Sequence, residues 1–367
     1  MSSLGRNKAD WRSWNVAITG MNAQPDNPGP GLAVARCLRH APEFRGRLIG
    51  LGYEVLDPGL YHRAVFDTSY LMPYPSEGLE SQLERLLEIH AKEGIDLIIP
   101  CLDAELNTFA HNEERFAAAG MRMLLPQLEQ LRLRAKDNLG ELCSRLGIDT
   151  PETVRISDTG FFERCRDEGW SYPLVVKGIF YDAAIVNSPE EAKSAFHRIA
   201  AQWGYPVLAQ QLVSGYEINL TAIGDGQGNM LGPVMMRKRA VTDKGKAWAG
   251  ISILDTELEQ MGRAILAATQ WRGPLEVEAL RSNDGRLYLI EVNPRFPAWV
   301  YLTHGVGCNL PQLLLRLVAG DHPLVLPQPA PGTLFIRYAE ELVTTLEQFE
   351  SMMIKGVLIT PQAAGTV

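Results

Sequence analysis

The chain has few of the features that mark a membrane, secreted or zinc-stapled protein. No apolar run approaches the ~20 residues of a membrane-spanning helix, and the first residues lack the apolar stretch of a secretory signal. The five cysteines form no Cys-x-x-Cys pair, which speaks against a disulfide framework or a structural zinc site. We therefore expect a protein of the reducing cytoplasm with no membrane partner.

An excess of basic residues is also missing. The net charge is −8 and no basic block occurs, so a nucleic-acid partner is not expected. The seven histidines never fall at the His-x-x-x-His or His-Glu-x-x-His spacing. The loop at 21–31 lacks a dinucleotide fingerprint, because Val34 stands where a third glycine or alanine would follow Gly29 and Gly31. The sequence thus argues against NAD binding.

The first third of the chain alternates apolar strands with helical segments. Strands are predicted at 15–19, 47–55 and 95–100 with helices between them, the pattern of βαβ units and a parallel sheet. We therefore predict a Rossmann-like α/β domain over residues 1–125. Beyond it the pattern changes to α+β, with neighbouring strands that are typical of antiparallel sheets, and 367 residues suffice for two or three domains in contact.

The segment 274–296 is the most informative. Two alternating strands flank Asp284–Gly285, a strong hairpin signal, and a two-residue turn there places Glu278 opposite Glu291 and Glu276 opposite Asn293. A four-residue turn would shift the pairing by two and keep these groups on one face. Carboxylates and an amide oxygen on one face are the hard ligands that magnesium prefers beside phosphates. Arg295 follows directly and could hold a phosphoryl group or an oxyanion. The alternative is an ordinary solvated sheet face, against which the apolar neighbours Phe296, Pro297 and Trp299 weigh.

Two lysines and a kinked connection are further candidates. Lys177 ends an apolar strand, and Lys136 lies near the start of a predicted helix. Either lysine alone is more often a solvent-exposed residue. An apolar strand at 207–213 breaks at Ser214–Gly215 and resumes with Glu217, a geometry that could present backbone groups to a base edge.

Taken in order, these segments resemble the ATP-grasp superfamily, in its carbamoyl-phosphate-synthase-like, carboxylate–amine ligase branch. The resemblance rests on Lys136, on the run that ends in Lys177, on residues 209–217 and 236–239, and on Glu-x-Asn-Pro-Arg-Phe with an acid 13 residues before it. It implies a pre-ATP-grasp domain over 1–125 and a two-lobed grasp. The small lobe would span 126–205, the large lobe with the metal site 206–322, and a strand and helix at 323–367 would complete or flank the large lobe.

The resemblance also implies the cofactors and the site. ATP and magnesium are expected, with manganese as an alternative. The metal ligands would be Glu278, Glu291 and Asn293, and Arg295 would stabilise the acyl phosphate or the tetrahedral intermediate. Further positive charge near the γ-phosphate would come from Arg237, Lys238 or Arg239, of which Lys238 and Arg239 are taken as catalytic. The nucleotide would contact the following residues: Lys136, Lys177, Gln210, Gln211, Leu212, Val213 and Glu217.

Three functions agree with these features. The first is ligation of a carboxylate to an amine through an acyl phosphate, with small-molecule or peptide substrates. The others are activation of bicarbonate and nucleotide-dependent regulation without turnover. The segment after Lys177 departs from the family because it contains only one glycine, Gly178, where a glycine-rich phosphate lid is expected. The loop 21–31, Asp103 and Glu105 could contact the acceptor, although a tight turn and a helix start need no function. A monomer and a homodimer are both compatible with the sequence.

Overall fold

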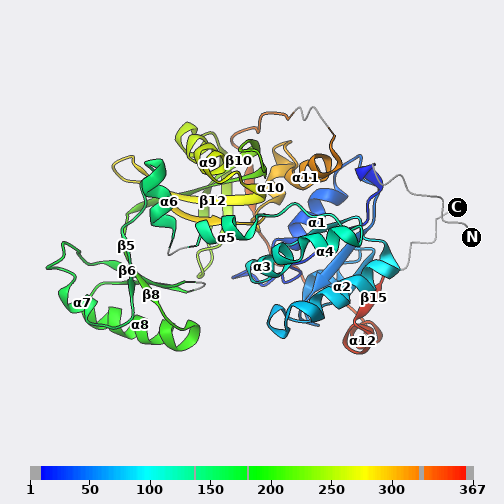
Figure 1. Ribbon diagram of the computed structural model, residues 1–367, viewed down its shortest axis with the longest axis horizontal. Helices are drawn as coiled ribbons and strands as arrows, with labels where there is room; N and C mark the ends of the chain where they lie inside the picture. The colour runs from blue at the N-terminus through cyan, green and yellow to red at the C-terminus, as the bar shows by residue number, and fades with distance from the viewer. Residues whose placement is uncertain (1–9, 136–137, 180–181, 322–325, 361–367) are drawn as a thin grey trace, which may run out of the picture.

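The computed structural model describes residues 10–135, 138–179, 182–321 and 326–360. Its strands form three sheets that belong to different parts of the molecule (Figure 1). The predicted α/β domain followed by α+β lobes is confirmed. In the described part of the chain, no helix combines the length and the apolar character that a bilayer crossing needs.

The first sheet contains five strands in the order β15-β3-β2-β1-β4. Its last strand in the chain, β15 (Val357–Ile359), lies antiparallel to β3 at the edge, so the C-terminal segment returns to the domain in which the chain begins (Figure 1). The helix before it, α12, spans Leu346–Glu350 and continues as a π-helical turn. The other four strands are parallel: β1 (Val16–Ile18), β2 (Leu48–Gly52), β3 (Thr68–Leu71) and β4 (Leu97–Ile99).

Helices cover both faces of the first sheet, which explains its continuous apolar strands. On one face, Val34 and Leu38 of α1 (Gly31–Arg39) pack with Val16 and Ile18. On the other face, Ala17 and Ile49 pack with three helices. These are α2 (Leu79–Glu93), α3 (Asp103–His111) and α4 (Glu113–Ala118).

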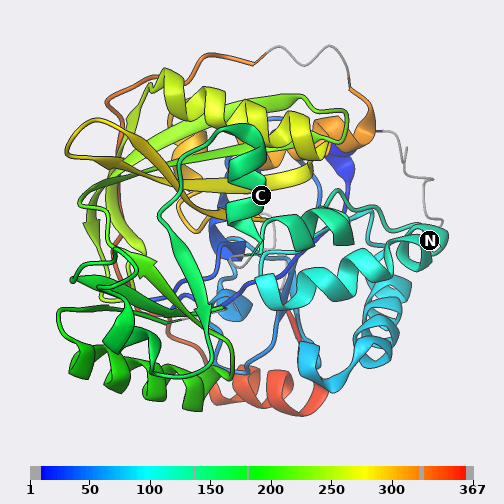
Figure 2. The same cartoon turned by 60° about the vertical axis from the view of Figure 1, so that its left-hand side comes forward.

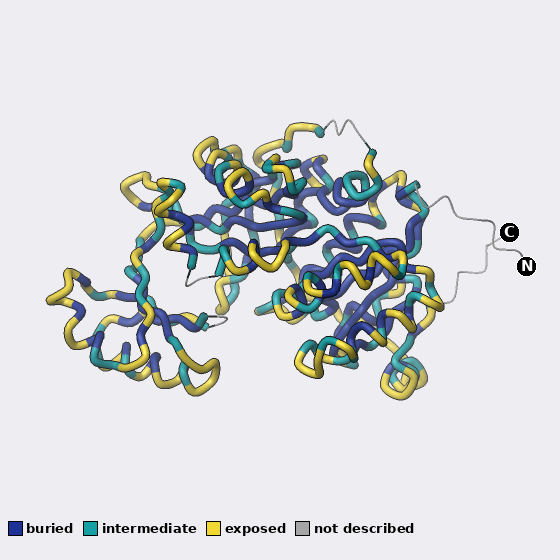
Figure 3. The backbone as a smooth tube through the Cα atoms, in the orientation of Figure 1, coloured by how far each residue is buried: buried dark blue, intermediate teal, exposed yellow. Residues whose placement is uncertain are grey.

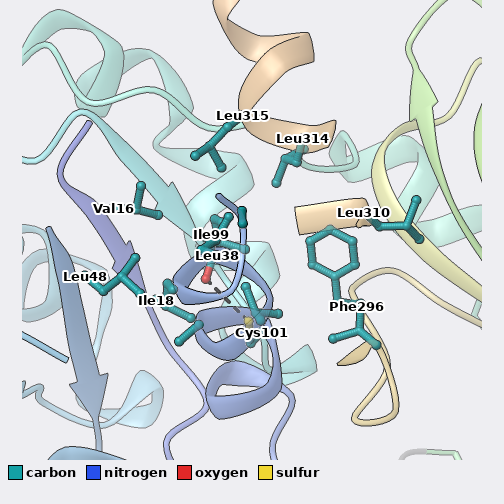
Figure 4. Close-up of a cluster of buried hydrophobic side chains, with 14 of the residues drawn as sticks. Val16, Ile18, Leu38, Leu48, Ile99, Cys101, Phe296, Leu310, Leu314 and Leu315 are labelled. Atoms are coloured by element: carbon teal, nitrogen blue, oxygen red, sulfur yellow. Dashed lines mark hydrogen bonds between the residues drawn. The ribbon is translucent and has the colours of Figure 1, made fainter. Parts of the chain in front are cut away.

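The core on the α1 side does not end at this domain. Helix α11 (Leu310–Ala319) contacts α1, and Figure 4 shows Leu314 and Leu315 above the strand residues and Leu310 beside Phe296. The same cluster includes Ile223, Val234 and Met236 of another sheet. The first domain and the large lobe therefore share one apolar core.

The large lobe is built on six strands in the order β13-β12-β9-β10-β11-β14. One face packs against α9 (Thr256–Thr269) through residues such as Val277 and Leu275. Because side chains alternate along a strand, Glu276 and Glu278 belong to the opposite face, which is turned toward the first domain. The strands are β9 (Gly215–Asp225), β10 (Met230–Val241), β11 (Ala247–Ile253), β12 (Arg272–Ser282), β13 (Leu287–Asn293) and β14 (Leu334–Ile336).

The small lobe projects from the remainder of the molecule, as Figures 1 and 2 show. It has its own buried core, which includes Phe161, Phe162 and Phe196, and Figure 3 shows buried segments within this lobe. Its sheet has the order β5-β8-β6-β7 and carries α7 (Phe161–Arg164) and α8 (Pro189–Trp203). The strands are β5 (Thr153–Ile156), β6 (Leu174–Gly178), β7 (Ala183–Val186) and β8 (Val207–Gln211).

The remaining helices lie at the joints between these parts. The helices α5 (Leu128–Leu133) and α6 (Leu139–Leu146) lead from the first domain to the small lobe, and α6 contacts α9. Helix α10 (Tyr301–Gly305) follows β13 and contacts α1.

Candidate functional site

The β12–β13 hairpin brings the predicted acidic residues together. Glu278 pairs with Glu291, and Glu276 pairs with Asn293, as the sequence predicts. All four therefore share the face of the large sheet that is turned toward the first domain.

The predicted two-residue turn of this hairpin is wrong. The Ser282 amide donates to the Arg286 carbonyl at 2.9 Å, so three residues form the turn, with Gly285 at φ 89°. A one-residue change in a turn would move every side chain to the other face. A β-bulge at Ile290 removes that shift, because Glu278 pairs with Glu291 whereas Ala279 pairs with Leu289.

Glu276 is the most deeply buried of these carboxylates, with 5% of its surface exposed. Its Oε1 accepts hydrogen bonds from Asn219 Nδ2 at 2.8 Å and from the indole Nε1 of Trp299 at 2.6 Å. Its Oε2 accepts from Asn293 Nδ2 at 3.1 Å. Burial and the charge of Glu278 raise the pKa of Glu276 to about 7.

Glu278 lies beside a cation. Its Oε2 is 3.3 Å from Lys238 Nζ, and its Oε1 accepts from Asn293 Nδ2 at 2.7 Å. Burial opposes ionisation of Glu278, but the charges of Lys238 and Lys246 outweigh it and lower its pKa to about 2. Burial likewise lowers the pKa of Lys238, yet the charges of Glu278 and Glu217 make the net shift upward. Both side chains therefore remain charged at neutral pH.

Arg295 joins the large lobe to the first domain. Its Nε donates to Asp103 Oδ2 at 2.6 Å, and Arg134 approaches the other oxygen of Asp103 at 3.5 Å. Although burial opposes each charge, the pKa of Arg295 is raised by Asp103 and Glu276, and the pKa of Asp103 is lowered by Arg295 and Arg134. Glu105 has a structural role instead: it is fully buried and accepts hydrogen bonds from Thr19, Tyr53 and two backbone amides.

Glu276, Glu278, Lys238 and Arg295 line one cavity of about 680 Å³, a volume that includes its open mouth. The loop of residues 22–30 forms the wall on the side of the first domain, at the carboxyl end of β1, and Cys101 and Leu102 follow β4 there. Open α/β sheets bind ligands at this position. Arg337, from the segment that follows β14, and Lys246 also line the cavity. Four cations and two carboxylates line the cavity in all: Lys238, Lys246, Arg295, Arg337, Glu276 and Glu278.

Several buried polar atoms around the cavity have no hydrogen-bond partner in the described part of the chain. They are Asn22 Oδ1, Asn219 Oδ1 and Arg337 Nε. Buried polar groups are normally satisfied, so orphaned atoms that gather at one cavity indicate a polar ligand.

The small lobe carries a second, separate group of predicted residues. Lys177 Nζ donates to Gln210 Oε1 at 3.1 Å, and both residues are buried. Gln210 Nε2 donates in turn to Thr153 Oγ1 at 2.7 Å, and Gln211 donates to Glu152 at 3.0 Å. These residues occupy β6, β8 and the approach to β5, so the predicted site is divided between two lobes.

The other predicted residues fall into three groups. Glu217 forms an ion pair with Lys238 and so joins the charged group on the large lobe. Arg239 is exposed at the bulge of β10, and Arg237 lies over the Tyr216 ring at 3.8 Å. Half-buried Leu212 and Val213 form the connection between β8 and β9, whereas Lys136 lies outside the described residues.

Sequence reasoning did not assign a role to several cavity residues. Glu276 could have been found, because it lies two residues before Glu278 on the same strand face. Trp299 was visible only as an apolar neighbour, although its indole donates to Glu276. Asn22 and Arg337 carry no sequence signal of their own, since only the folded chain brings them to this cavity, and the same holds for Asn219, which donates to Glu276.

The donor set suits a divalent cation that is also bound by phosphate. In the described residues, no three His, Cys, Asp or Glu side chains could hold a metal ion by themselves. Glu278, Glu291 and Asn293 offer two carboxylates and an amide, a partial oxygen set of the kind magnesium completes with phosphate and water. Ionised Glu278 fits that use.

No protein-family model matches the chain. Among curated proteins, the chain is similar to the vancomycin/teicoplanin A-type resistance protein VanA of Enterococcus faecium, with 27% identity over 175 residues. That match covers 41% of this chain and 51% of the relative. The carbamoyl phosphate synthase large chain of Halomonas eurihalina is 24% identical over 210 residues, which cover 52% of this chain and 19% of that protein. The chain thus spans about half the length of the first relative and about a fifth of the second.

Solved structures match over most of the chain. The biotin carboxylase domain of 2-oxoglutarate carboxylase from Hydrogenobacter thermophilus, solved with MgADP and bicarbonate, superposes with a TM-score of 0.64 at 18% identity. The match covers 86% of this chain and 72% of that one. The L-amino acid ligase from Bacillus licheniformis gives a TM-score of 0.62 at 18% identity, covering 84% of this chain and 74% of that one.

Proposed function

Because the chain has the ATP-grasp fold, we propose that it is an ATP-dependent ligase that joins a carboxylate to an amine through an acyl phosphate. One observation carries the proposal: the paired Glu278 and Glu291 share a sheet face with Asn293, and Lys238 and Arg295 line the cavity beside them. A regulatory scaffold has no need to keep opposed carboxylates, which destabilise a sheet unless cations offset them.

ATP lies between the two lobes in this proposal. Lys177 contacts its phosphates from the small lobe, and Gln210 and Gln211 line the adenine, which an amide side chain can pair with. The connection at Leu212 and Val213 contributes backbone groups. Glu217 accepts hydrogen bonds from the ribose hydroxyls. These bonds replace the ion pair that Glu217 forms with Lys238.

Glu278, Glu291 and Asn293 would hold magnesium, which when bound neutralises phosphate charge and orients the β- and γ-phosphates. The remaining chemistry belongs to the charged side chains. Lys238 stays protonated beside Glu278 and stabilises the negative charge of the phosphoryl group while it is transferred. Arg295 is fixed by Asp103 and stabilises the oxyanion that develops at the acyl carbon.

The reaction balances in two steps. A substrate carboxylate oxygen forms a bond to the γ-phosphorus as the bond to ADP breaks, which yields an acyl phosphate. The amine nitrogen then forms a bond to the acyl carbon, the bond from that carbon to the bridging oxygen breaks so that inorganic phosphate leaves, and the proton lost by the nitrogen passes to solvent. Positioning and charge stabilisation dominate such transfers, so no covalent nucleophile is required from the protein.

The test is ADP release from ATP and magnesium with a panel of carboxylates and amines, with hydroxylamine added to capture the acyl phosphate as a hydroxamate. ADP and hydroxamate that depend on one carboxylate support the proposal. ADP release with bicarbonate alone would instead favour bicarbonate activation, the alternative suggested by the likeness to a biotin carboxylase domain. AMP as the product would contradict the mechanism, and nucleotide binding without turnover in any arm would favour a regulatory protein.

A further inference from the structure

The cavity lining includes two positively charged side chains that the proposed reaction does not use, Arg337 and Lys246. Arg337 lies just beyond β14, and its NH2 donates to the Ala298 carbonyl at 3.1 Å, while its Nε is buried without a hydrogen-bond partner. Burial lowers the pKa of Arg337. Among the described residues, neither Arg337 nor Lys246 forms an ion pair with a carboxylate, whereas Lys238 and Arg295 each do.

Arg337 lies close to the buried acid. Arg337 contacts Ala298, and the next residue, Trp299, donates its indole hydrogen to Glu276 at 2.6 Å. A guanidinium and a carboxylate thus flank the same short loop and line the same cavity. Glu276 and Glu278 both accept hydrogen bonds from Asn293, beside which the proposed acyl phosphate forms.

We propose that Arg337 and Lys246 bind a carboxylate group of the amine substrate, so that the acceptor is a free amino acid. Its amino group points toward Glu276 and the acyl carbon, and its carboxylate pairs with Arg337. The planar guanidinium suits a carboxylate, because two parallel hydrogen bonds can form. The orphaned Nε of Arg337 gains an acceptor in this arrangement. This inference rests on the proposed ligase function.

The experiment compares each of the twenty amino acids with its amide as the acceptor, using the full chain, ATP, magnesium and the donor carboxylate found by hydroxamate capture. Arg337→Gln is the test variant, because glutamine can still donate to the Ala298 carbonyl but carries no charge. Arg263→Gln is the matched control, since Arg263 is an exposed α9 residue paired with Glu259. Thermal melting of all three proteins checks folding.

We expect the parent to use an amino acid about 10–100-fold better than its amide, the range for a charge-assisted contact. Arg337→Gln loses that factor in kcat/KM for the amino acid, chiefly through KM, and keeps its activity toward the amide and toward hydroxylamine. Arg337→Lys restores part of the preference. Arg263→Gln behaves like the parent throughout.

Other results overturn the inference in distinguishable ways. If the parent uses amides as well as amino acids while hydroxamate still forms, the ligase function stands and the carboxylate subsite does not. If Arg337→Gln lowers hydroxamate formation as much as ligation, Arg337 supports the fold or the first step instead. If the parent yields neither ADP nor hydroxamate in any arm, the ligase function fails and this inference fails with it.

Discussion

The two lobes of this chain hold their charged residues in different ways. On the large lobe, Glu276 accepts three hydrogen bonds, and Asn293 donates to two carboxylates within a buried group. On the small lobe, buried Lys177 donates a hydrogen bond to Gln210 Oε1 at 3.1 Å. The large lobe also shares its core with the first domain, whereas the small lobe has a core of its own.

This difference matches the two tasks that the proposed reaction sets. Charge that develops on transferring atoms is best stabilised by groups that need not reorganise, and a buried hydrogen-bond network supplies such groups. Binding a nucleotide also requires contacts, but their geometry can be less accurate than that of the groups which stabilise the transferring atoms. We therefore expect changes on the large lobe to reduce the rate of the chemical step, and changes on the small lobe to weaken nucleotide binding.

The largest effect should come from Glu291, which faces Glu278 across the hairpin. Glu291→Gln keeps the shape but removes one charged metal ligand, so ADP formation should fall ~100-fold or more while the protein melts normally. Steady-state ADP release at saturating magnesium and ATP measures this. Glu347→Gln, an exposed residue of α12, serves as the control. A folded Glu291→Gln protein with near-normal turnover would contradict the assignment of Glu291 as a ligand of the catalytic metal.

A pair of lysine variants tests the division between the lobes. Lys177→Met should raise the dissociation constant of a non-hydrolysable ATP analogue by about 10–100-fold, because a buried charge-assisted contact is lost. Lys238→Met should reduce kcat more than analogue binding, since its charge serves the transferring group. Calorimetry and steady-state kinetics on both variants separate the two effects. Equal losses of binding and turnover in both variants would contradict the assignment of nucleotide binding to the small lobe and of the chemical step to the large lobe.

The contact between the large lobe and the first domain gives a prediction about stability. Asp103→Asn leaves Arg295 buried without its ion pair, so the free energy of unfolding at pH 7 should fall by about 1–3 kcal/mol. Because Arg295 lowers the pKa of Asp103, the stabilisation is present above the ordinary carboxyl pKa and is lost as the pH falls through the lowered value.

Denaturant titrations of the parent and of Asp103→Asn from pH 7 down to pH 3 check this. The difference between the two proteins should shrink below about pH 4, where Asp103 of the unfolded parent becomes protonated while the folded parent still holds it ionised. Asp158→Asn, an exposed turn residue of the small lobe, is a control with no ion pair to lose among the described residues. A constant difference across the range would show that Asp103 acts through packing and not through charge.

The acidic cluster and the fold could be predicted from the sequence because their signals are local. These signals are the alternation of apolar and polar residues along a strand and the turn residues between strands. It predicted the pairing of Glu278 with Glu291 while missing both the three-residue turn and the bulge at Ile290. Two one-residue errors cancelled, and only packing against the neighbouring strands decides between such registers.

The parts that could not be predicted depend on segments far apart in the chain. Arg337 and Asn22 meet at one cavity because the tail passes along the large sheet before it returns to the first domain. No local pattern encodes that path. The path of the tail also explains the missed strand β15, which has only three residues and gains its hydrogen bonds at the edge of a distant sheet.

The smallest effect concerns the short connection after Lys177. Only four residues separate β6 from β7, a short connection at the place where the resemblance predicts a glycine-rich lid, and Asp182 in it pairs with Arg198. Phe180 and Tyr181, the aromatic residues of this connection, lie outside the described residues. With fewer backbone amides available to the phosphates, we expect the acceptor to complete the site.

A non-hydrolysable ATP analogue should therefore bind more tightly when an amino acid that stimulates ADP release is present. A coupling of ~1–3 kcal/mol is typical between two sites, which corresponds to about 5–150-fold in the dissociation constant. Linkage requires the analogue to tighten amino-acid binding by the same factor, so calorimetric titrations in both orders check each other. An amino acid that does not stimulate ADP release is the control and should leave the analogue's affinity unchanged. Equal affinities with and without the active amino acid would mean that the short connection is a trimmed lid that leaves nucleotide binding independent of the acceptor.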